Sequence, residues 1–244
     1  MTRPDAHDTN APLTAILLCG GRGERLKPFT DTLPKPLACL NGEPLLAHLL
    51  RYLAAAGIAR FVVCVGHKHE AIELFLQAHA RPAYEITCVN SGDASMTDRL
   101  LDARRHVRGP ALVCYGDTLA NVDLRALRRV HQASGALATL TTYPLYSTFG
   151  IVDFDAEGRV NAFTEKPRLP YWINIGFILC EPAAFDLIEP RSDMPDFLSA
   201  LAARGALYAH RHTGQHLTVN TERDRALAET QMVEFFTHMD GQIR

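Results

Sequence analysis

Short apolar runs alternate with segments of helical periodicity along the first half of the chain. The run Thr14–Cys19 shows no polar alternation, which is typical of a strand buried on both faces of a parallel sheet. In Pro44–Ala56, leucines recur at the three- and four-residue spacing of a helix that packs on one side. The pattern predicts strands at 14–19, 61–66, 84–90 and 111–115, and helices at 44–56, 69–80 and 98–107.

The second half mixes strands and helices less regularly. Asp155-Ala156-Glu157-Gly158 is rich in turn formers and predicts a hairpin between strands at 150–154 and 159–163. A long terminal helix is predicted at 221–239, with Thr221 as its N-cap and Asp224 in its first turn. The remaining predicted elements are helices at 123–134, 183–188 and 196–203, and strands at 136–143 and 173–180.

This order of elements predicts an α/β fold. Strands that alternate with helices form a Rossmann-like, mixed but mainly parallel sheet with helices on both faces and right-handed crossovers. Since the sequence shows no repeat or linker, we expect a single domain over residues 13–244, preceded by a disordered polar lead-in at 1–12. Ligands of such folds bind beyond the carboxyl ends of the strands.

Composition narrows the class of protein. The net charge of −2 gives no electrostatic indication of nucleic-acid binding. No apolar stretch approaches the roughly 20 residues that cross a bilayer, and the start of the chain does not resemble a signal peptide. We therefore expect a cytoplasmic protein that binds neither nucleic acid nor membrane.

The cysteines indicate free thiols rather than a metal site. None of the six belongs to a Cys-X-X-Cys pair, so zinc is not expected. Four lie in or beside apolar runs, and we expect them to be buried and reduced: Cys19, Cys64, Cys114 and Cys180.

A glycine-rich loop at 20–25 directly follows the first predicted strand. Its backbone N–H groups can surround phosphate oxygens, and Arg22 and Arg25 add positive charge. Lys35 follows between two prolines that hold the backbone extended. The loop is neither a P-loop nor a Gly-X-Gly-X-X-Gly dinucleotide motif, and taken alone it could equally be a tight turn with solvated arginines.

The longer string is more specific. Residues 18–26, Leu-Cys-Gly-Gly-Arg-Gly-Glu-Arg-Leu, followed by Pro34-Lys35-Pro36-Leu37, resemble the opening motif of sugar-1-phosphate nucleotidylyltransferases. The resemblance implies that Arg25 and Lys35 stabilise charge on the α-phosphate and the departing pyrophosphate. The nucleotide-binding residues that it implies are Leu18, Gly20, Gly21, Arg22, Gly23, Glu24, Thr97 and Gly116.

Three later segments resemble the same family. Tyr115-Gly116-Asp117 matches its strand-end aspartate, which implies that Asp117 binds Mg²⁺ as a cofactor. Phe163–Pro167 matches a Glu-Lys-Pro segment, which implies that Lys166 contacts the sugar phosphate; in isolation the same residues would be a solvated surface pair. Trp172–Gly176 matches a strand that lines the sugar pocket. The implied sugar-phosphate-binding residues besides Lys166 are Gly150, Glu165, Trp172, Asn174 and Gly176.

Within this family, the glucose-1-phosphate cytidylyltransferase branch is most similar. Residues 90–97 resemble the loop that helps that branch read the base, which favours CTP. Two departures stand out: Asp98-Arg99 replaces the branch's Gly-Gly-Arg, and Asn220 stands where the family has a second metal-binding aspartate. Because an amide brings no charge, we expect Asn220 to give weaker Mg²⁺ binding.

The expected reaction joins a nucleoside triphosphate to a sugar 1-phosphate and releases pyrophosphate, with 13–122 as the nucleotide-binding half and 123–244 as the sugar-phosphate half. A phosphate oxygen is the nucleophile, so neither a general base nor a covalent intermediate is needed. GTP with a mannose-, heptose- or cyclitol-type phosphate is one alternative, and a non-catalytic regulatory subunit that binds sugar nucleotides is another. Zinc on His210, His212 and His216 is a third reading, and a homo-oligomer stays open.

Overall fold

The computed structural model of the chain describes residues 12–79 and 81–242, with the backbone alone for 233–242. The expected lead-in therefore lies outside the described residues, apart from Pro12. Within the described ranges, no helix is long and apolar enough to span a membrane.

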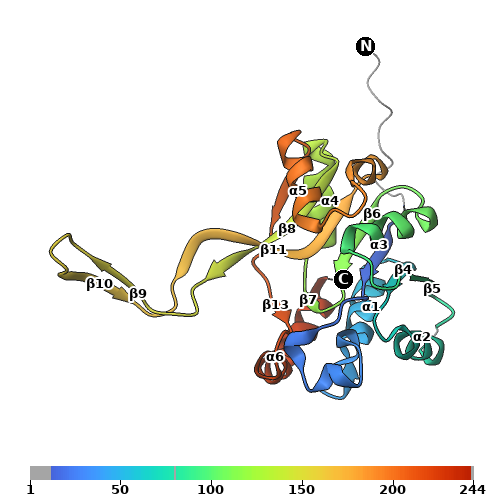
Figure 1. Cartoon of the computed structure of the whole chain (residues 1–244), viewed down its shortest axis with the longest axis horizontal. Helices are drawn as coiled ribbons and strands as arrows, with labels where there is room; N and C mark the ends of the chain where they lie inside the picture. Colours follow the sequence, from blue (N-terminus) through green and yellow to red (C-terminus); the bar gives the residue numbers. More distant parts are fainter. Residues whose placement is uncertain (1–11, 80, 243–244) are drawn as a thin grey trace, which may run out of the picture.

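A seven-stranded sheet in the order β12-β8-β11-β6-β1-β4-β5 forms the centre of the molecule (Figure 1). The strands β1 (Thr14–Leu18), β4 (Arg60–Val65), β5 (Glu85–Asn90) and β6 (Ala111–Tyr115) are parallel. Strand β11 (Arg168–Cys180) runs antiparallel to both β6 and β8 (Ala138–Tyr146), and β12 (Leu207–Arg211) is parallel to β8. The mixed, mainly parallel α/β sheet is confirmed.

Each central strand is buried on both faces. In β1, Ala15 and Leu17 belong to one apolar cluster, whereas Ile16 and Leu18 belong to the other. This two-sided burial explains why the strand is apolar throughout.

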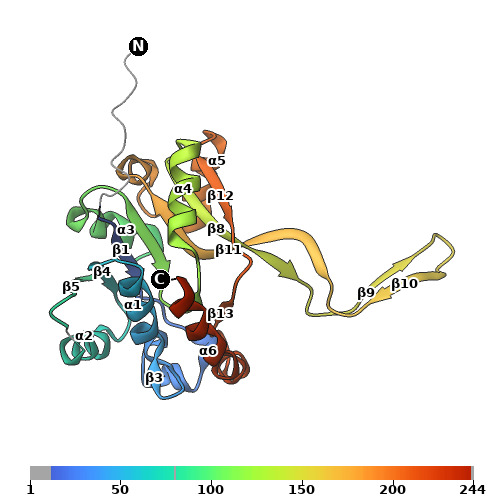
Figure 2. The same cartoon turned by 180° about the vertical axis from the view of Figure 1, so that it is seen from behind.

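Helices supply the rest of both clusters (Figures 1 and 2). The first cluster contains residues of α1 (Leu45–Ala55), α2 (His69–Ala78), α4 (Leu124–Ser134) and α6 (Glu222–Gln242). The second contains residues of α3 (Met96–Ala103) and α5 (Met194–Ala203). Helices therefore cover both faces of the sheet, as predicted.

Several boundaries differ from the sequence prediction. Helix α3 begins at Met96 instead of Asp98, because the Ser95 hydroxyl accepts the Asp98 N–H at 3.1 Å and caps the helix. The predicted helix at 183–188 is a 3₁₀ segment, Pro182–Leu187. The N-cap role of Thr221 is confirmed, since its hydroxyl accepts the Asp224 N–H at 3.1 Å.

Two short ribbons were not predicted. Strands β2 (Cys39–Leu40) and β3 (Glu43–Pro44) pair with each other. Strands β7 (Thr118–Ala120) and β13 (His216–Thr218) pair antiparallel, with Thr218 opposite Thr118. The second ribbon brings the chain beyond Thr218 back to the end of β6.

A long arm leaves the body of the molecule (Figures 1 and 2). We define it as residues 146–171. Its root is the paired outer part of β8 and β11, and its tip is the hairpin of β9 (Ile151–Phe154) and β10 (Val160–Thr164). The hairpin predicted around Asp155–Gly158 is confirmed, with Gly158 N–H donating to the Asp155 carbonyl at 3.0 Å.

The cysteine prediction is confirmed. All six cysteines lie in the described ranges and are free, and the four expected to be buried are buried.

Candidate active site

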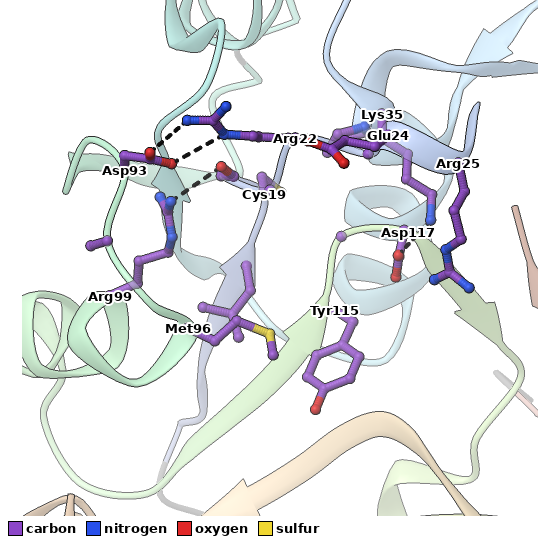
Figure 3. Close-up of a pocket in the computed structure, with 17 residues that line it drawn as sticks. Cys19, Arg22, Glu24, Arg25, Lys35, Asp93, Met96, Arg99, Tyr115 and Asp117 are labelled. Atoms are coloured by element: carbon purple, nitrogen blue, oxygen red, sulfur yellow. Dashed lines mark hydrogen bonds and ion pairs between the residues drawn. The ribbon is translucent and has the colours of Figure 1, made fainter. Parts of the chain in front are cut away.

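A cavity of about 500 Å³ opens at the carboxyl ends of β1 and β6 (Figure 3). This is the edge of the sheet where α/β folds bind ligands. Its wall contains the whole glycine-rich loop at 20–25 and the two residues that directly follow β6, Gly116 and Asp117. The lining residues are Leu18, Cys19, Gly20, Gly21, Arg22, Gly23, Glu24, Arg25, Lys35, Pro36, Asp93, Ala94, Met96, Arg99, Tyr115, Gly116 and Asp117.

The glycine-rich loop packs closely against Lys35. Gly23 has φ 63°, a left-handed conformation, and a Cβ there would lie 3.0 Å from the Lys35 Cβ. Both facts make a residue with a side chain strained at this position. The 3₁₀ turn Glu24–Leu26 follows and places Arg25 at the cavity.

Lys35 is the centre of a polar cluster from distant parts of the chain. Its residue is only 7% exposed. Its Nζ donates to Asp117 Oδ2 at 2.7 Å and to Asn220 Oδ1 at 2.9 Å, and Arg25 Nη2 donates to the same amide oxygen at 3.0 Å. Because a buried ammonium group is costly unless it is paired, these contacts hold the four residues in one arrangement.

The β7–β13 ribbon explains how Asn220 reaches Asp117. Asn220 follows the ribbon, and its backbone N–H donates to the Asp224 carboxylate at 3.1 Å, at the start of α6. Its side-chain Nδ2 donates to Thr218 Oγ1 at 3.3 Å. This donation turns the amide oxygen toward Lys35 and Arg25.

Oxygen atoms of Asp117 and Asn220 converge on the same point, the Lys35 ammonium. One carboxylate and one amide oxygen are hard donors of the kind that Mg²⁺ prefers, and Mg²⁺ usually takes few protein ligands beside substrate phosphates. The donor set fits that ion. By contrast, no group of three or more His, Cys, Asp or Glu side chains suited to a metal occurs among the described residues, so the three-histidine zinc reading gains no support.

A second set of charged side chains lies at the other end of the cavity (Figure 3). Arg22 Nη2 and Asp93 Oδ2 form an ion pair of 2.6 Å that joins the glycine-rich loop to the loop after β5. The neighbouring guanidinium holds the pKa of Asp93 below its usual range.

Arg99 links three backbone segments behind that ion pair. Its guanidinium donates to the carbonyls of Val65, Gly20 and Gly92 at 2.6, 3.1 and 2.9 Å. The side chain is buried, and it fixes the ends of β1 and β4 against the loop after β5.

Tyr115 and Cys19 form the floor between the two ends. The Tyr115 hydroxyl accepts Asn174 Nδ2 at 3.3 Å. Gly176 has φ 77°, and a Cβ there would lie 2.4 Å from the Tyr115 ring, so β11 can approach the cavity only with glycine at this position. Burial raises the pKa of the Cys19 thiol, which therefore stays protonated and is a poor nucleophile.

The other predicted site residues lie away from the cavity. Glu165 and Lys166 are exposed on the arm between β10 and β11, with 3.6 Å between Lys166 Nζ and Glu165 Oε1, and Glu165 lies close to Gly150. Trp172 lies at the root of the arm, between the guanidinium groups of Arg168 and Arg211. Thr97 is buried and donates to the Ser192 carbonyl instead of facing the cavity.

The structure thus brings together Leu18, residues 20–25, Lys35, Gly116, Asp117 and Asn220, with Asn174 and Gly176 beside them. The sequence predicted no binding role for seven lining residues: Cys19, Pro36, Asp93, Ala94, Met96, Arg99 and Tyr115. Four of them, Asp93, Ala94, Met96 and Arg99, lie in or just after the segment 90–97 that resembles a base-reading loop, which is the signal that could have found them.

Comparison with known proteins agrees with this geometry. The family model described as nucleotidyl transferase matches residues 14–213. Glucose-1-phosphate cytidylyltransferase of Salmonella typhi is 32% identical over 245 residues, covering 89% of this chain and 95% of that protein. Mannose-1-phosphate guanylyltransferase 1 of Arabidopsis thaliana is 29% identical, covering 87% of this chain and 62% of that protein.

The fold has solved counterparts. HddC from Yersinia pseudotuberculosis aligns with a TM-score of 0.70 at 19% identity, over 90% of this chain and 99% of that chain. This likeness shows the fold and leaves the substrates to be argued from the site.

Proposed function

Because the chain belongs to the nucleotidyl transferase family and is a sugar-1-phosphate nucleotidyltransferase, we propose that it transfers the cytidylyl group of CTP to glucose 1-phosphate. The products are CDP-glucose and pyrophosphate. The observation that carries the proposal is the cluster of Arg25, Lys35, Asp117 and Asn220 beside the glycine-rich loop. Arg25 and Lys35 supply positive charge for the triphosphate. Asp117 supplies negative charge for the metal ion that accompanies it.

Two observations favour cytosine as the base. The cytidylyltransferase of Salmonella typhi is similar over nearly the full length of both chains. Asp93, Ala94 and Met96, from the segment that resembles the base-reading loop of that branch, line the cavity. GTP is the second candidate, since the Arabidopsis thaliana guanylyltransferase is also similar over most of this chain.

In this proposal, Arg25 and Lys35 stabilise the negative charge of the phosphates. The loop at 20–25 binds the triphosphate through its backbone N–H groups, while Arg25 and Lys35 offset the charge that develops on the α-phosphate and pyrophosphate. Lys35 must exchange its contact with Asp117 for one with phosphate. Asp117 and Asn220 would hold Mg²⁺, which when bound neutralises phosphate charge and orients the leaving group.

Transfer is direct. A sugar-phosphate oxygen is already anionic at neutral pH, so it attacks the α-phosphorus in line without a general base. The thiol of Cys19 lines the cavity, and its raised pKa disfavours a covalent intermediate on this residue.

The second half of the chain binds the sugar phosphate in this proposal. Asn174 and Gly176 contact the sugar, and their packing against Tyr115 of the cavity wall supports this role. Lys166 orients the attacking phosphate, with Gly150, Glu165 and Trp172 near the sugar. Lys166 has φ 46°, unusual for a non-glycine residue, and such strain is often found at functional positions. We also place the enzyme in the cytoplasm, where free thiols stay reduced.

A matrix of four nucleoside triphosphates against several sugar 1-phosphates, read by pyrophosphate release with Mg²⁺, tests the proposal. We expect the largest kcat/KM for CTP with glucose 1-phosphate. A larger kcat/KM with GTP would show that the nucleotide substrate is GTP instead of CTP. Faster turnover with a mannose-, heptose- or cyclitol-type phosphate would show that this compound, and not glucose 1-phosphate, is the acceptor. Absence of pyrophosphate with every pair would favour the non-catalytic regulatory alternative, for which Asn220 is the main support.

Replacing Lys35 with alanine tests the charge argument. Preorganised charge at the transition state is typically worth about 10²–10³ in kcat, so Lys35→Ala should lower kcat by at least that factor. Lys27→Ala is the matched control, because Lys27 is an exposed lysine of the same segment that forms a loose ion pair of 3.9 Å with Asp31. Near-normal turnover by the Lys35 variant would refute the role.

A further inference from the structure

The turn between β4 and α2 contains a strained lysine. Lys68, the residue before α2, has φ 55° and ψ 39°, which is the left-handed conformation. Residues with a side chain rarely adopt it, whereas glycine does so without steric cost. Backbone geometry alone would therefore favour glycine here, and a lysine at this position calls for a reason that lies in its side chain. Strained residues of this kind are often found where a functional geometry is maintained.

The Lys68 side chain contacts the segment 26–34, which connects the glycine-rich loop to Lys35. Its ammonium group donates to the backbone carbonyl of Thr30. A hydrogen bond from an ionised donor is stronger than one between neutral groups. Thr30 is buried, whereas the other residues from 27 to 33 are half-buried or exposed. Thr30 therefore attaches an otherwise exposed stretch to the body of the molecule.

Thr30 connects this contact to the glycine-rich loop. Its hydroxyl donates to the Gly23 carbonyl at 3.1 Å. Gly23 also packs against Lys35, since a Cβ at Gly23 would lie 3.0 Å from the Lys35 Cβ. The same Cβ would lie 3.1 Å from Thr30 Cγ2. One line of contacts thus runs from Lys68 through Thr30 and Gly23 to the buried side chain of Lys35.

The turn before α2 also contacts the start of the loop and is closely packed itself. The His67 backbone N–H donates to the Gly20 carbonyl at 3.3 Å. A Cβ at Gly66 would lie 2.3 Å from the Gly92 carbonyl oxygen and 2.5 Å from Arg99 Nη1, so the turn has no spare room. It is therefore a rigid base for the lysine that follows.

We propose that Lys68 is a positioning residue, which holds Thr30 and thereby fixes the glycine-rich loop and the Lys35 ammonium group in the geometry needed for transfer. The described residues that line the cavity do not include Lys68, so it acts through Thr30 and not on the substrate. The inference rests on the proposed function, because it concerns where Lys35 lies relative to the α-phosphate. Preorganised charge stabilises a transition state only where it is correctly placed, and a displacement of about 1 Å can cost on the order of 10²-fold in rate.

Lys68→Gly tests the proposal, because glycine keeps the left-handed backbone and removes only the side chain. We expect kcat for pyrophosphate release to fall about 10- to 100-fold, with a cooperative thermal transition and an unchanged KM for the sugar 1-phosphate. Lys68→Arg keeps an ionised donor and should recover most of the rate. Lys27→Ala is the matched control, since it removes an exposed lysine next to the same segment and should leave kcat unchanged.

A double-mutant cycle tests the route through Thr30. Thr30→Val removes the hydroxyl that donates to Gly23 and keeps the shape of the side chain. Two residues that act along one line of contacts have non-additive effects, so the double variant with Lys68→Gly should lose little more kcat than the worse single variant. If the two losses multiply, Lys68 acts independently of Thr30 and the proposal is wrong.

Two further results would overturn the proposal. Wild-type kcat in Lys68→Gly would show that the side chain is not needed, and an equal loss in Lys68→Arg and Lys68→Gly would show that the ionised donor does not matter. Failure of the proposed function looks different, because the wild type itself would then release no pyrophosphate with any pair of substrates. An active wild type with an equally active Lys68→Gly contradicts this inference alone.

Discussion

At the scale of single residues, the site depends on the hydrogen bonds of the buried Lys35 ammonium group. Lys35 has two acceptors, Asp117 and Asn220, and Arg25 has the second of them as well. Two cations therefore face a single formal negative charge. An amide in place of a second carboxylate leaves the cluster with surplus positive charge, which suits phosphate and would bind a divalent ion more weakly than two carboxylates.

Asn220→Asp tests this charge balance. An added carboxylate about 4 Å from a divalent ion contributes between ~2 and ~8 kcal/mol at effective dielectric constants of 80 to 20, so half-saturation should need at least roughly tenfold less Mg²⁺. The measurement is pyrophosphate release titrated with Mg²⁺. An unchanged Mg²⁺ dependence would mean that Asn220 is not a ligand.

The motif residues of the cavity could be predicted because they are consecutive in sequence. The glycine-rich loop and its lysine are fixed by local chemistry, and the structure places them along one wall. Tyr115 could not be predicted, since its place depends on Gly176 of a distant antiparallel strand. The pairing of Arg22 with Asp93 likewise depends on the separation of two loops, which only the register of β1, β4 and β5 defines.

At the scale of elements, Arg99 connects structure to function. From α3 it ties together the ends of β1 and β4 and the loop after β5 by bonding three carbonyls. Arginine is suited to this because its planar fork donates in several directions at once.

Arg99→Lys keeps the charge but cannot make all three contacts. Hydrogen bonds to charged groups are worth ~1.5–3 kcal/mol each, so we expect a loss of about 2–4 kcal/mol in the free energy of unfolding and a higher KM for the nucleotide. Urea unfolding and steady-state kinetics measure the two effects. Arg104→Lys, which alters only an exposed ion pair with Asp186, should change either by little; an equal effect of both variants would contradict the role of Arg99.

Strand β13 makes stability depend on pH. Burial lowers the pKa of His216 to about 4, with His212 nearby adding to the effect. Below the ordinary value of about 6.5 the unfolded chain binds a proton that the folded chain refuses, so stability falls between about pH 6.5 and pH 4, by up to about 3 kcal/mol. Urea midpoints at several pH values should fall less steeply for His216→Gln. If the urea midpoints of the wild type and of His216→Gln fall equally with pH, His216 does not contribute to the pH dependence of stability.

Elements with a strong period were predictable, and those that depend on partners were not. Strand β1 is apolar because both its faces are covered. The outer part of β11, from Arg168 to Trp172, includes Pro170 and lies outside the sheet's core, so its strand character comes from pairing with β8. The ribbon strands β7 and β13 have three residues each, too few to show a period.

At the scale of the whole molecule, the two proposed substrates depend on different parts of the chain. The cavity proposed for the triphosphate lies at the ends of β1 and β6, while Lys166 is exposed on the arm between β10 and β11. This division predicts that the two binding functions can be impaired separately.

Lys166→Ala should raise KM for the sugar 1-phosphate by about tenfold or more, because a charge-assisted contact to phosphate contributes ~1.5–3 kcal/mol. Thermal stabilisation by the nucleotide alone should be unchanged. Arg159→Ala, at the far end of the same hairpin, is the control. If KM for the sugar phosphate stays normal, Lys166 does not contact it.

The contact between Lys35 and Asp117 has a consequence for what the cavity admits. Lys35 already has a counter-ion within the protein, Asp117, so a bare triphosphate gains Lys35 only by leaving Asp117 as a repulsive neighbour. A triphosphate complexed with a divalent ion would supply Asp117 with a new partner when Lys35 is released. Under the proposed function, the site would thereby discriminate between the free and the complexed forms of one nucleotide before any base or sugar is recognised.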